Sequence, residues 1–242
     1  MSLFLKRVLK LFQIFQSGFY INALLKNYVL ASVEHSAILK KIEKCETIID
    51  IGANKGQFSL VSRKIFPDSK IFSFEPLNEP VIIFKKLFED DKNTIMNQVA
   101  IGYERGRIPI NVSKKNDSSS ILPIGLQQKN IFPGTDKSHS EDIQISRLKD
   151  FISLENLVQP VFVKIDVQGY ELEVLRGCDD LIEHFKYLFI ECSYIELYEG
   201  QALAFQVLEF LNSRRFKLQG VYNTSYDKKG IAVQSDFLFS KE

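Results

Sequence analysis

Cysteine and histidine are scarce in this sequence of 242 residues, which contains three of each. The cysteines, Cys45, Cys178 and Cys192, are odd in number and form neither a Cys-x-x-Cys pair nor a Cys/His spacing typical of a metal site. We therefore expect reduced thiols in a cytoplasmic protein, with neither a disulfide framework nor a bound metal.

Long apolar runs are also missing. Residues 3–16 carry apolar side chains at helical spacing, but Lys6, Arg7 and Lys10 interrupt them, and the run is shorter than the roughly 20 apolar residues that span a bilayer. The segment lacks the small-residue cleavage site of an export signal. Two interpretations remain for residues 1–16: a helix packed on the domain or on a second copy of the chain, or a peripheral helix on the inner face of the membrane.

Most of the chain has no excess of positive charge. The formal net charge is +1, yet residues 1–44 contain seven Lys/Arg against two Glu, so the remainder is slightly acidic. A domain without a basic surface makes nucleic acid an unexpected partner. With 45% hydrophobic and 25% charged residues, the composition predicts one globular domain, residues 45–242, preceded by a helical appendage, residues 1–44.

A third glycine is missing from the stretch around which the chain is organised, residues 47–56 (TIIDIGANKG). A β-branched run leads through Asp50 to Gly52 and Gly56, where the backbone can turn tightly and a ligand can approach closely. A dinucleotide site requires Gly-x-Gly-x-x-Gly for its pyrophosphate, whereas this loop has Gly-x-x-x-Gly behind a carboxylate that would repel a pyrophosphate. The loop favours S-adenosyl-L-methionine, which carries an ammonium and a sulfonium but no phosphate.

A second acidic residue, Glu75, ends the next predicted strand, residues 71–75 (IFSFE). A carboxylate at this point can accept hydrogen bonds from both ribose hydroxyls of the cofactor. NAD sites place an acid at a similar spacing, so Glu75 alone does not distinguish the two cofactors and the glycine loop decides.

Strands and helices alternate from residue 48 onward, which predicts a mostly parallel sheet with helices on both faces. Residues 114–141 have no periodicity and are predicted to be a cap on the substrate side, with simple disorder as the alternative. We call them the cap segment. The predicted strands are 48–51, 71–75, 93–101, 106–112, 143–146, 160–166, 187–192, 216–222 and 236–240, and the predicted helices are 3–16, one or two within 21–44, 57–66, 78–88, 148–155, 171–176 and 202–214.

Candidate catalytic groups lie at the ends of the later strands. Residues 160–166 (PVFVKID) form a continuous apolar run typical of a central strand, so Asp166 should stand at the carboxyl edge, where open α/β sheets bind ligands. Glu191 ends the next strand, Glu171 begins a helix, and His139 lies in the cap segment. Each could accept a proton from a hydroxyl during methyl transfer, and Asp166 is our first candidate. The alternative for the carboxylates is a structural role, such as binding the cofactor ammonium or capping a helix.

Four motifs occur in one order along the chain: Ile49-Asp50-Ile51-Gly52-Ala53-Asn54-Lys55-Gly56, Phe74-Glu75-Pro76, the stretch from Lys164 to Gly177, and Asp236-Phe237-Leu238-Phe239. With these motifs the chain resembles the FkbM family of S-adenosylmethionine-dependent methyltransferases over about residues 47–240. The resemblance implies the class I methyltransferase fold, a Rossmann-like α/β sheet of seven mostly parallel strands with the last strand antiparallel. It further implies that Asp166 faces the transfer site. It assigns the methionine side of the cofactor to Asp50, Gly52, Asn54 and Gly56, the ribose side to Glu75 and Pro76, and the adenine side to Val99 or Ala100.

The sequence thus predicts an O-methyltransferase that acts on a hydroxyl of a small molecule such as a sugar or glycan precursor. Two alternatives from other classes remain, an NAD-dependent oxidoreductase and a non-catalytic adenosyl-binding scaffold domain.

Overall fold

The structure, a computed structural model, describes residues 3–241, with side chains from Val8 onward. Its main sheet has seven strands in the order β3-β2-β1-β7-β8-β10-β9. Strands β3, β2, β1, β7 and β8 are parallel, and β10 runs antiparallel to both of its neighbours. The predicted class I methyltransferase sheet is confirmed. The strands are β1 Thr47–Ile51, β2 Lys70–Phe74, β3 Thr94–Asn97, β7 Val161–Ile165, β8 Tyr187–Ser193, β9 Phe216–Tyr226 and β10 Ala232–Lys241.

The two central strands, β1 and β7, are buried along their whole length because helices cover both faces of the sheet. Successive side chains alternate between the faces. Ile49 and Val163 belong to one apolar cluster, whereas Ile48 and Phe162 belong to the other. This double burial is why residues 161–165 form a continuous apolar run in the sequence, with Lys164 as the one charged exception.

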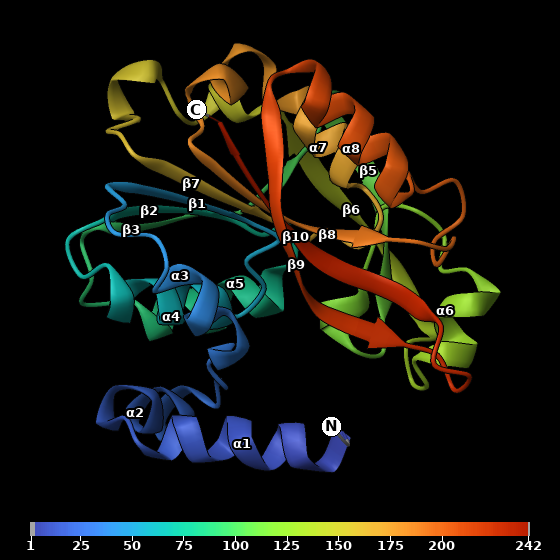
Figure 1. Ribbon diagram of the computed structural model, residues 1–242, viewed down its shortest axis with the longest axis horizontal. Coiled ribbons are helices and arrows are strands. Elements are labelled where there is room, and N and C mark those ends of the chain that lie inside the picture. Colours follow the sequence, from blue (N-terminus) through green and yellow to red (C-terminus); the bar gives the residue numbers. More distant parts are fainter. Residues whose placement is uncertain (1–2, 242) are drawn as a thin grey trace.

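Helices form a layer on each side of the sheet (Figure 1). One layer contains α4 Gln57–Ile65 and α5 Asn78–Leu87, and the other contains α7 Glu171–Gly177 and α8 Ala204–Ser213. Their buried apolar residues supply the two clusters, for example Phe58 and Phe84 on one face and Val174 and Leu211 on the other.

The N-terminal segment consists of α1 Leu3–Phe15, α2 Gly18–Asn27, the 3-10 turn η1 Val33–His35 and α3 Ser36–Leu39. The predicted first helix is confirmed. Helix α2 begins earlier than predicted because Ser17 caps it, and it ends where Tyr28 adopts a left-handed φ of 56°. Figure 1 shows α1 and α2 at the edge of the molecule, beneath the α4 and α5 layer. Ile14 of α1 and Tyr20 of α2 are buried in the same apolar cluster as Leu39, Cys45 and Phe162, so the inner side of the N-terminal segment is part of the core.

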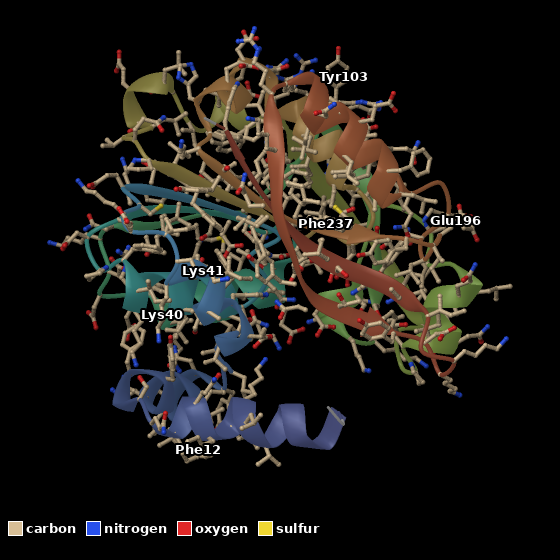
Figure 2. All side chains as sticks on the ribbon, viewed as in Figure 1. Phe12, Lys40, Lys41, Tyr103, Glu196 and Phe237 are labelled. Carbon is tan, nitrogen blue, oxygen red and sulfur yellow. The ribbon has the colours of Figure 1, made fainter. Side chains whose placement is uncertain are left out.

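No single helix among residues 3–241 is long and apolar enough to cross a membrane. Residues of α1 and α2 meet the length and composition criteria only as a pair bent by 104°. Large apolar side chains of this pair are exposed, and Phe12 lies on the side of α1 that faces away from the body (Figure 2).

The prediction of an unpatterned cap segment is wrong in part. It contains the turn η2 Asn116–Ser118, helix α6 Leu126–Ile131 and the first residues of β6 Lys137–Ser146, which begins before the predicted strand 143–146. Strand β6 pairs with β5 Gly106–Ser113 and with β4 Ala100–Ile101 in a separate three-stranded sheet. The sequence concealed the start of β6 because residues 137–142 are all exposed and show no apolar alternation.

Other boundaries also differ from the predictions, and β9 and β10 are each longer than the predicted strands 216–222 and 236–240. The predicted strand 93–101 divides at Asn97, where β3 leaves the main sheet before β4 joins the second one. The predicted helix 148–155 is two separate 3-10 turns, η3 Leu148–Asp150 and η4 Leu154–Asn156.

Candidate active site

The carboxyl ends of β1, β2, β7 and β8 border a cavity of about 510 Å³, which we call the strand-end cavity. Segments far apart in the chain form its other walls, including Glu34 and His35 of η1 and Ser120 of the cap segment. Six of the predicted cofactor residues line it: Gly52, Asn54, Glu75, Pro76, Val99 and Ala100. Two of the four predicted catalytic residues, Asp166 and Glu191, line it as well.

Gly52 occupies a position that excludes any side chain. Its φ is +77°, and a Cβ atom there would lie 1.8 Å from the carbonyl oxygen of Asp166. Its N–H donates to the carbonyl oxygen of Phe74 at 3.0 Å, so the loop is held between the ends of β2 and β7. The predicted need for glycine is therefore met by close backbone packing in the wall of the cavity.

Glu75 presents a fixed carboxylate to the cavity. Oε2 accepts the backbone N–H of Asn54 at 3.0 Å and Oε1 accepts that of Leu77 at 2.9 Å. The residue is 7% exposed, and burial raises the pKa of the carboxyl to about 7. Because a carboxylate has about four acceptor sites, each oxygen can still accept one ribose hydroxyl.

Asp50 does not line the strand-end cavity, contrary to the prediction. It is fully buried beneath the glycine loop, where it accepts from Ser59 Oγ at 2.7 Å and lies 3.4 Å from Lys164 Nζ. The charge that was expected to select against a pyrophosphate is thus paired inside the protein.

Lys164 is the residue that the sequence analysis missed at this point. Its Nζ donates to the Gly52 carbonyl at 2.8 Å and lies 3.7 Å from Asp166 Oδ2. Burial alone would lower the pKa of Lys164, but the carboxylates of Asp50, Asp166 and Glu191 outweigh it and the pKa is raised. The available signal was a single lysine within the apolar run of a central strand.

Gly56 also lies outside the strand-end cavity, contrary to the prediction. It is the left-handed N-cap of α4, with φ of 89°. A Cβ atom there would lie 2.9 Å from the rings of Phe84 and Phe88, so glycine is required for packing between α4 and α5.

Asp166 and Glu191 are joined by an amide. Gln168 Nε2 donates to Asp166 Oδ1 at 2.7 Å and to Glu191 Oε2 at 2.8 Å. The second oxygen of Glu191 accepts from Gln234 Nε2 at 2.8 Å. Burial, followed by the charges of Asp166 and Asp236, raises the pKa of Glu191. The side chain of Asp166 remains 37% exposed, so it is the more accessible of the two carboxylates.

The other two catalytic candidates do not line the strand-end cavity. Glu171 is 4% exposed and its Oε1 accepts the N–H groups of Val167 and Gly169 at 3.2 and 3.0 Å, so it holds the turn after β7. Burial raises its pKa to about 7. His139 lies on the exposed part of β6, where Nε2 is 2.8 Å from Glu141 Oε1.

His35, which was not among the candidate residues, also lines the cavity. Its Nε2 lies 3.4 Å from Asp236 Oδ2, and its ring packs between those of Phe58 and Phe189 at centroid distances of 5.5 and 5.4 Å. Asp236 also accepts from Asn223 Nδ2 at 2.7 Å. The signal in the sequence was Asp236 as the first residue of the closing motif. Within residues 3–241, no group of three or more His, Cys, Asp or Glu side chains is arranged to hold a metal ion.

Comparison with known proteins agrees with this geometry. A family model described as "Methyltransferase FkbM domain" matches residues 50–218. "Methyltransferase 1" of Beauveria bassiana is 28% identical over 151 residues, and the match spans 57% of this chain and 59% of the relative. "2-O-methyltransferase NoeI" of Sinorhizobium fredii is 26% identical over 186 residues, covering 74% of this chain and 76% of the relative.

The solved structures that resemble this chain include a precorrin-6y C5,15-methyltransferase from Geobacter metallireducens GS-15. The TM-score is 0.47 and the sequence identity 13%, and the match covers 86% of this chain and 87% of that one. The strand order of the main sheet and the glycine loop at the end of β1 stand independently of that likeness. The family match covers both the loop and the strand-end carboxylates Asp166 and Glu191. This chain belongs to the FkbM family of methyltransferases, which use S-adenosyl-L-methionine as the methyl donor.

Proposed function

We propose that the protein is an O-methyltransferase whose acceptor is a hydroxyl of a small polyhydroxylated molecule, such as a sugar or glycan precursor. The observation that carries this proposal is the pair of carboxylates, Asp166 and Glu191, which line the strand-end cavity and are joined through Gln168. The relative from Sinorhizobium fredii, whose name specifies 2-O-methylation, supports a hydroxyl acceptor. Because the chain belongs to a methyltransferase family, we do not retain the oxidoreductase and scaffold alternatives.

The strand-end cavity fits the donor in size and chemistry. Its volume of about 510 Å³ lies within the roughly 300–1,000 Å³ of typical ligand pockets. We assign Glu75 to the ribose hydroxyls, the buried Val99 and Ala100 to the adenine side, and Gly52 and Asn54 to the methionine side. The carboxylate of Glu75 suits the binding of ribose hydroxyls, because hydrogen bonds from two backbone N–H groups orient it in the absence of a ligand.

When bound, S-adenosylmethionine supplies a methyl group on a sulfonium, whose S–C bond breaks as the O–C bond to the acceptor forms. The protein aligns the acceptor and removes its proton. Alignment can supply about 7–11 kcal/mol, and a general base adds about 10²–10⁴-fold.

Asp166 is our choice for the group that orients the acceptor hydroxyl and accepts its proton. Its Oδ1 accepts from Gln168 Nε2, whereas its Oδ2 lies 3.7 Å from Lys164 Nζ. The side chain of Asp166 is 37% exposed, so an acceptor can reach it. Both oxygens of Glu191, by contrast, already accept amide hydrogens.

The donor assignment is tested by calorimetric titration with S-adenosylhomocysteine. Glu75→Ala should weaken binding by about 1.5–3 kcal/mol, because hydrogen bonds to a charged group are lost. Glu89→Ala is the matched control, since Glu89 is exposed on the surface. If the parent protein bound no S-adenosylhomocysteine, the proposed function would fail, and equal binding by Glu75→Ala would remove Glu75 from the ribose site.

We also infer that the enzyme is cytoplasmic and that α1 and α2 attach it to an anionic membrane surface. Their apolar side chains are unusually exposed, with Phe12 and Phe15 at 60% and Leu25 at 71%. Residues 1–44 also carry seven Lys/Arg against two Glu, which complements anionic headgroups.

Vesicle sedimentation separates this attachment from self-association. Phe12→Ser/Phe15→Ser should reduce binding to phosphatidylglycerol vesicles, while its affinity for S-adenosylhomocysteine stays close to that of the parent. If the parent protein did not bind such vesicles, and if it were a dimer in solution while the double variant were a monomer, this surface would instead be assigned to a second copy of the chain.

A further inference from the structure

A second cavity, of about 320 Å³, lies next to the strand-end cavity, and we call it the cap cavity. The two share four residues, Asp117, Asp166, Gln168 and Glu191. The remaining wall of the cap cavity comes from the cap segment and from the end of β10, and includes Gln128, Phe132, Thr135 and Gln234. A molecule in the cap cavity would therefore touch the same carboxylates that border the donor site.

The side chain of Gln168 stands where the two cavities meet, and it is held rigidly. Its Nε2 bridges Asp166 and Glu191, and its Oε1 accepts from Tyr198 Oη at 2.7 Å. Its backbone carbonyl accepts from Ser120 Oγ at 2.6 Å, and its φ is 56°. Every polar group of this side chain is paired, so Gln168 links Asp166 and Glu191 at the boundary between the two cavities.

Gln128 carries an unsatisfied polar atom in the wall of the cap cavity. Its residue is 3% exposed, and its Oε1 is buried without a hydrogen-bond partner. Buried acceptors are nearly always paired, so an unpaired one on a cavity wall indicates a missing donor. A ligand hydroxyl is such a donor.

The charges around the cap cavity indicate which ligands it accepts. Three carboxylates line it, those of Asp117, Asp166 and Glu191, against one cation, Lys115. Lys115 Nζ is already engaged, since it donates to the carbonyl oxygen of Pro133 at 2.8 Å. An anionic group such as a phosphate would meet an excess of negative charge, whereas uncharged hydroxyls would find acceptors.

The cap cavity has the size and the lining of a site for one small ring. Its volume lies at the lower end of the range for ligand pockets, roughly 300–1,000 Å³, so it holds one small ring with any remainder of the ligand outside. Phe132 offers an apolar surface beside the amides and carboxylates. A single sugar ring has this combination of an apolar face and an edge of hydroxyls.

We propose that the cap cavity is the acceptor subsite and that it binds an uncharged, polyhydroxylated ring of monosaccharide size, with Gln128 accepting a hydroxyl of that ring and with the carboxylates of Asp117, Asp166 and Glu191 selecting against phosphorylated acceptors. The proposal rests on the proposed O-methyltransferase function and adds the place and charge of the acceptor.

The test is a binding measurement by ligand-observed NMR with S-adenosylhomocysteine at saturation. The probes are neutral methyl hexopyranosides, each compared with the corresponding hexose 6-phosphate. We expect at least one neutral glycoside to bind at least about tenfold more tightly than the phosphates, because the subsite repels anions. Gln128→Ala should weaken that glycoside at least about tenfold, and Gln127→Ala, on the exposed side of the same helix, should leave it unchanged.

A second variant keeps the proposal open to refutation if Gln128→Ala folds poorly. Asp117→Asn removes one carboxylate from the shared wall and should narrow the preference for neutral over phosphorylated probes. Tighter binding of phosphates, full glycoside affinity in Gln128→Ala, or no glycoside binding at all would overturn the acceptor subsite. Loss of S-adenosylhomocysteine binding by the parent protein would instead overturn the proposed function.

Discussion

Replacement of Lys164 by methionine tests the charge arrangement beneath the glycine loop. The change keeps an unbranched apolar stem in the core but removes the ammonium group. Asp50 is fully buried, and its Oδ1 has no hydrogen-bond partner and only the ammonium of Lys164, 3.4 Å away, as a charge partner. In the variant, Asp50 would therefore keep only its hydrogen bond from Ser59. The Gly52 carbonyl would also lose its donor at 2.8 Å.

The expected cost is large because one partner of a buried ion pair is removed while the other stays. Such a change costs about 3–5 kcal/mol, a substantial part of the roughly 5–15 kcal/mol that stabilises a typical domain. The loop carrying Gly52 should loosen at the same time, since its carbonyl is no longer held. We therefore expect a lower free energy of unfolding and weaker binding of S-adenosylhomocysteine by Lys164→Met.

Urea unfolding measures the first effect, and a second substitution identifies its cause. Asp50→Asn in the Lys164→Met background removes the unpaired charge and should recover part of the lost stability. Lys44→Met is the matched control, because Lys44 is 72% exposed and its pair with Glu46 lies on the surface. A Lys164→Met midpoint equal to that of the parent, or a double variant no more stable than Lys164→Met, would refute the reasoning.

Three further predictions concern the strand-end cavity. Burial raises the pKa of Glu75 from 4.5 to about 7, so the folded state binds this proton more tightly than the unfolded chain and stability should fall as the pH rises between these values; Glu75→Gln should remove part of that slope in urea unfolding, and an unchanged slope would contradict the burial effect. Gly52→Ala would place a Cβ atom 1.8 Å from the Asp166 carbonyl oxygen, so it should abolish binding of S-adenosylhomocysteine in calorimetry, and normal affinity would show that the loop yields. Asp166→Asn should lower single-turnover transfer about 10²-fold or more while cofactor affinity changes by less than about tenfold; lost affinity with near-normal transfer would make Asp166 a donor ligand instead.

The sequence predicted the parts of this protein that burial dictates. The central strands follow from apolar runs, the glycine loop follows from its backbone requirement, and the placement of Glu75, Asp166 and Glu191 follows from strand ends in a parallel sheet. These features depend on local pattern and on one rule of topology. For that reason they could be read from a single chain.

Features that depend on contacts between distant segments were not readable in the same way. The pairing of Asp50 with Lys164 and that of His35 with Asp236 each join residues more than a hundred positions apart. Strand β6 is polar along its first six residues and gains its strand character from β5. Whether Glu171 faced the cavity or the turn after β7 depended on two backbone N–H groups that no side-chain pattern reveals.

The wall that the N-terminal segment gives to the strand-end cavity has a thermodynamic consequence. Lys10 of α1 pairs with Glu34 at 2.9 Å, and both residues line that cavity. Under the proposed attachment, a shift of α1 on a membrane would reach the donor site through this pair, and linkage would then require donor binding to change the membrane affinity of α1 by the same factor. Donor affinity measured with and without vesicles, and vesicle affinity measured with and without donor, would then give the same coupling free energy.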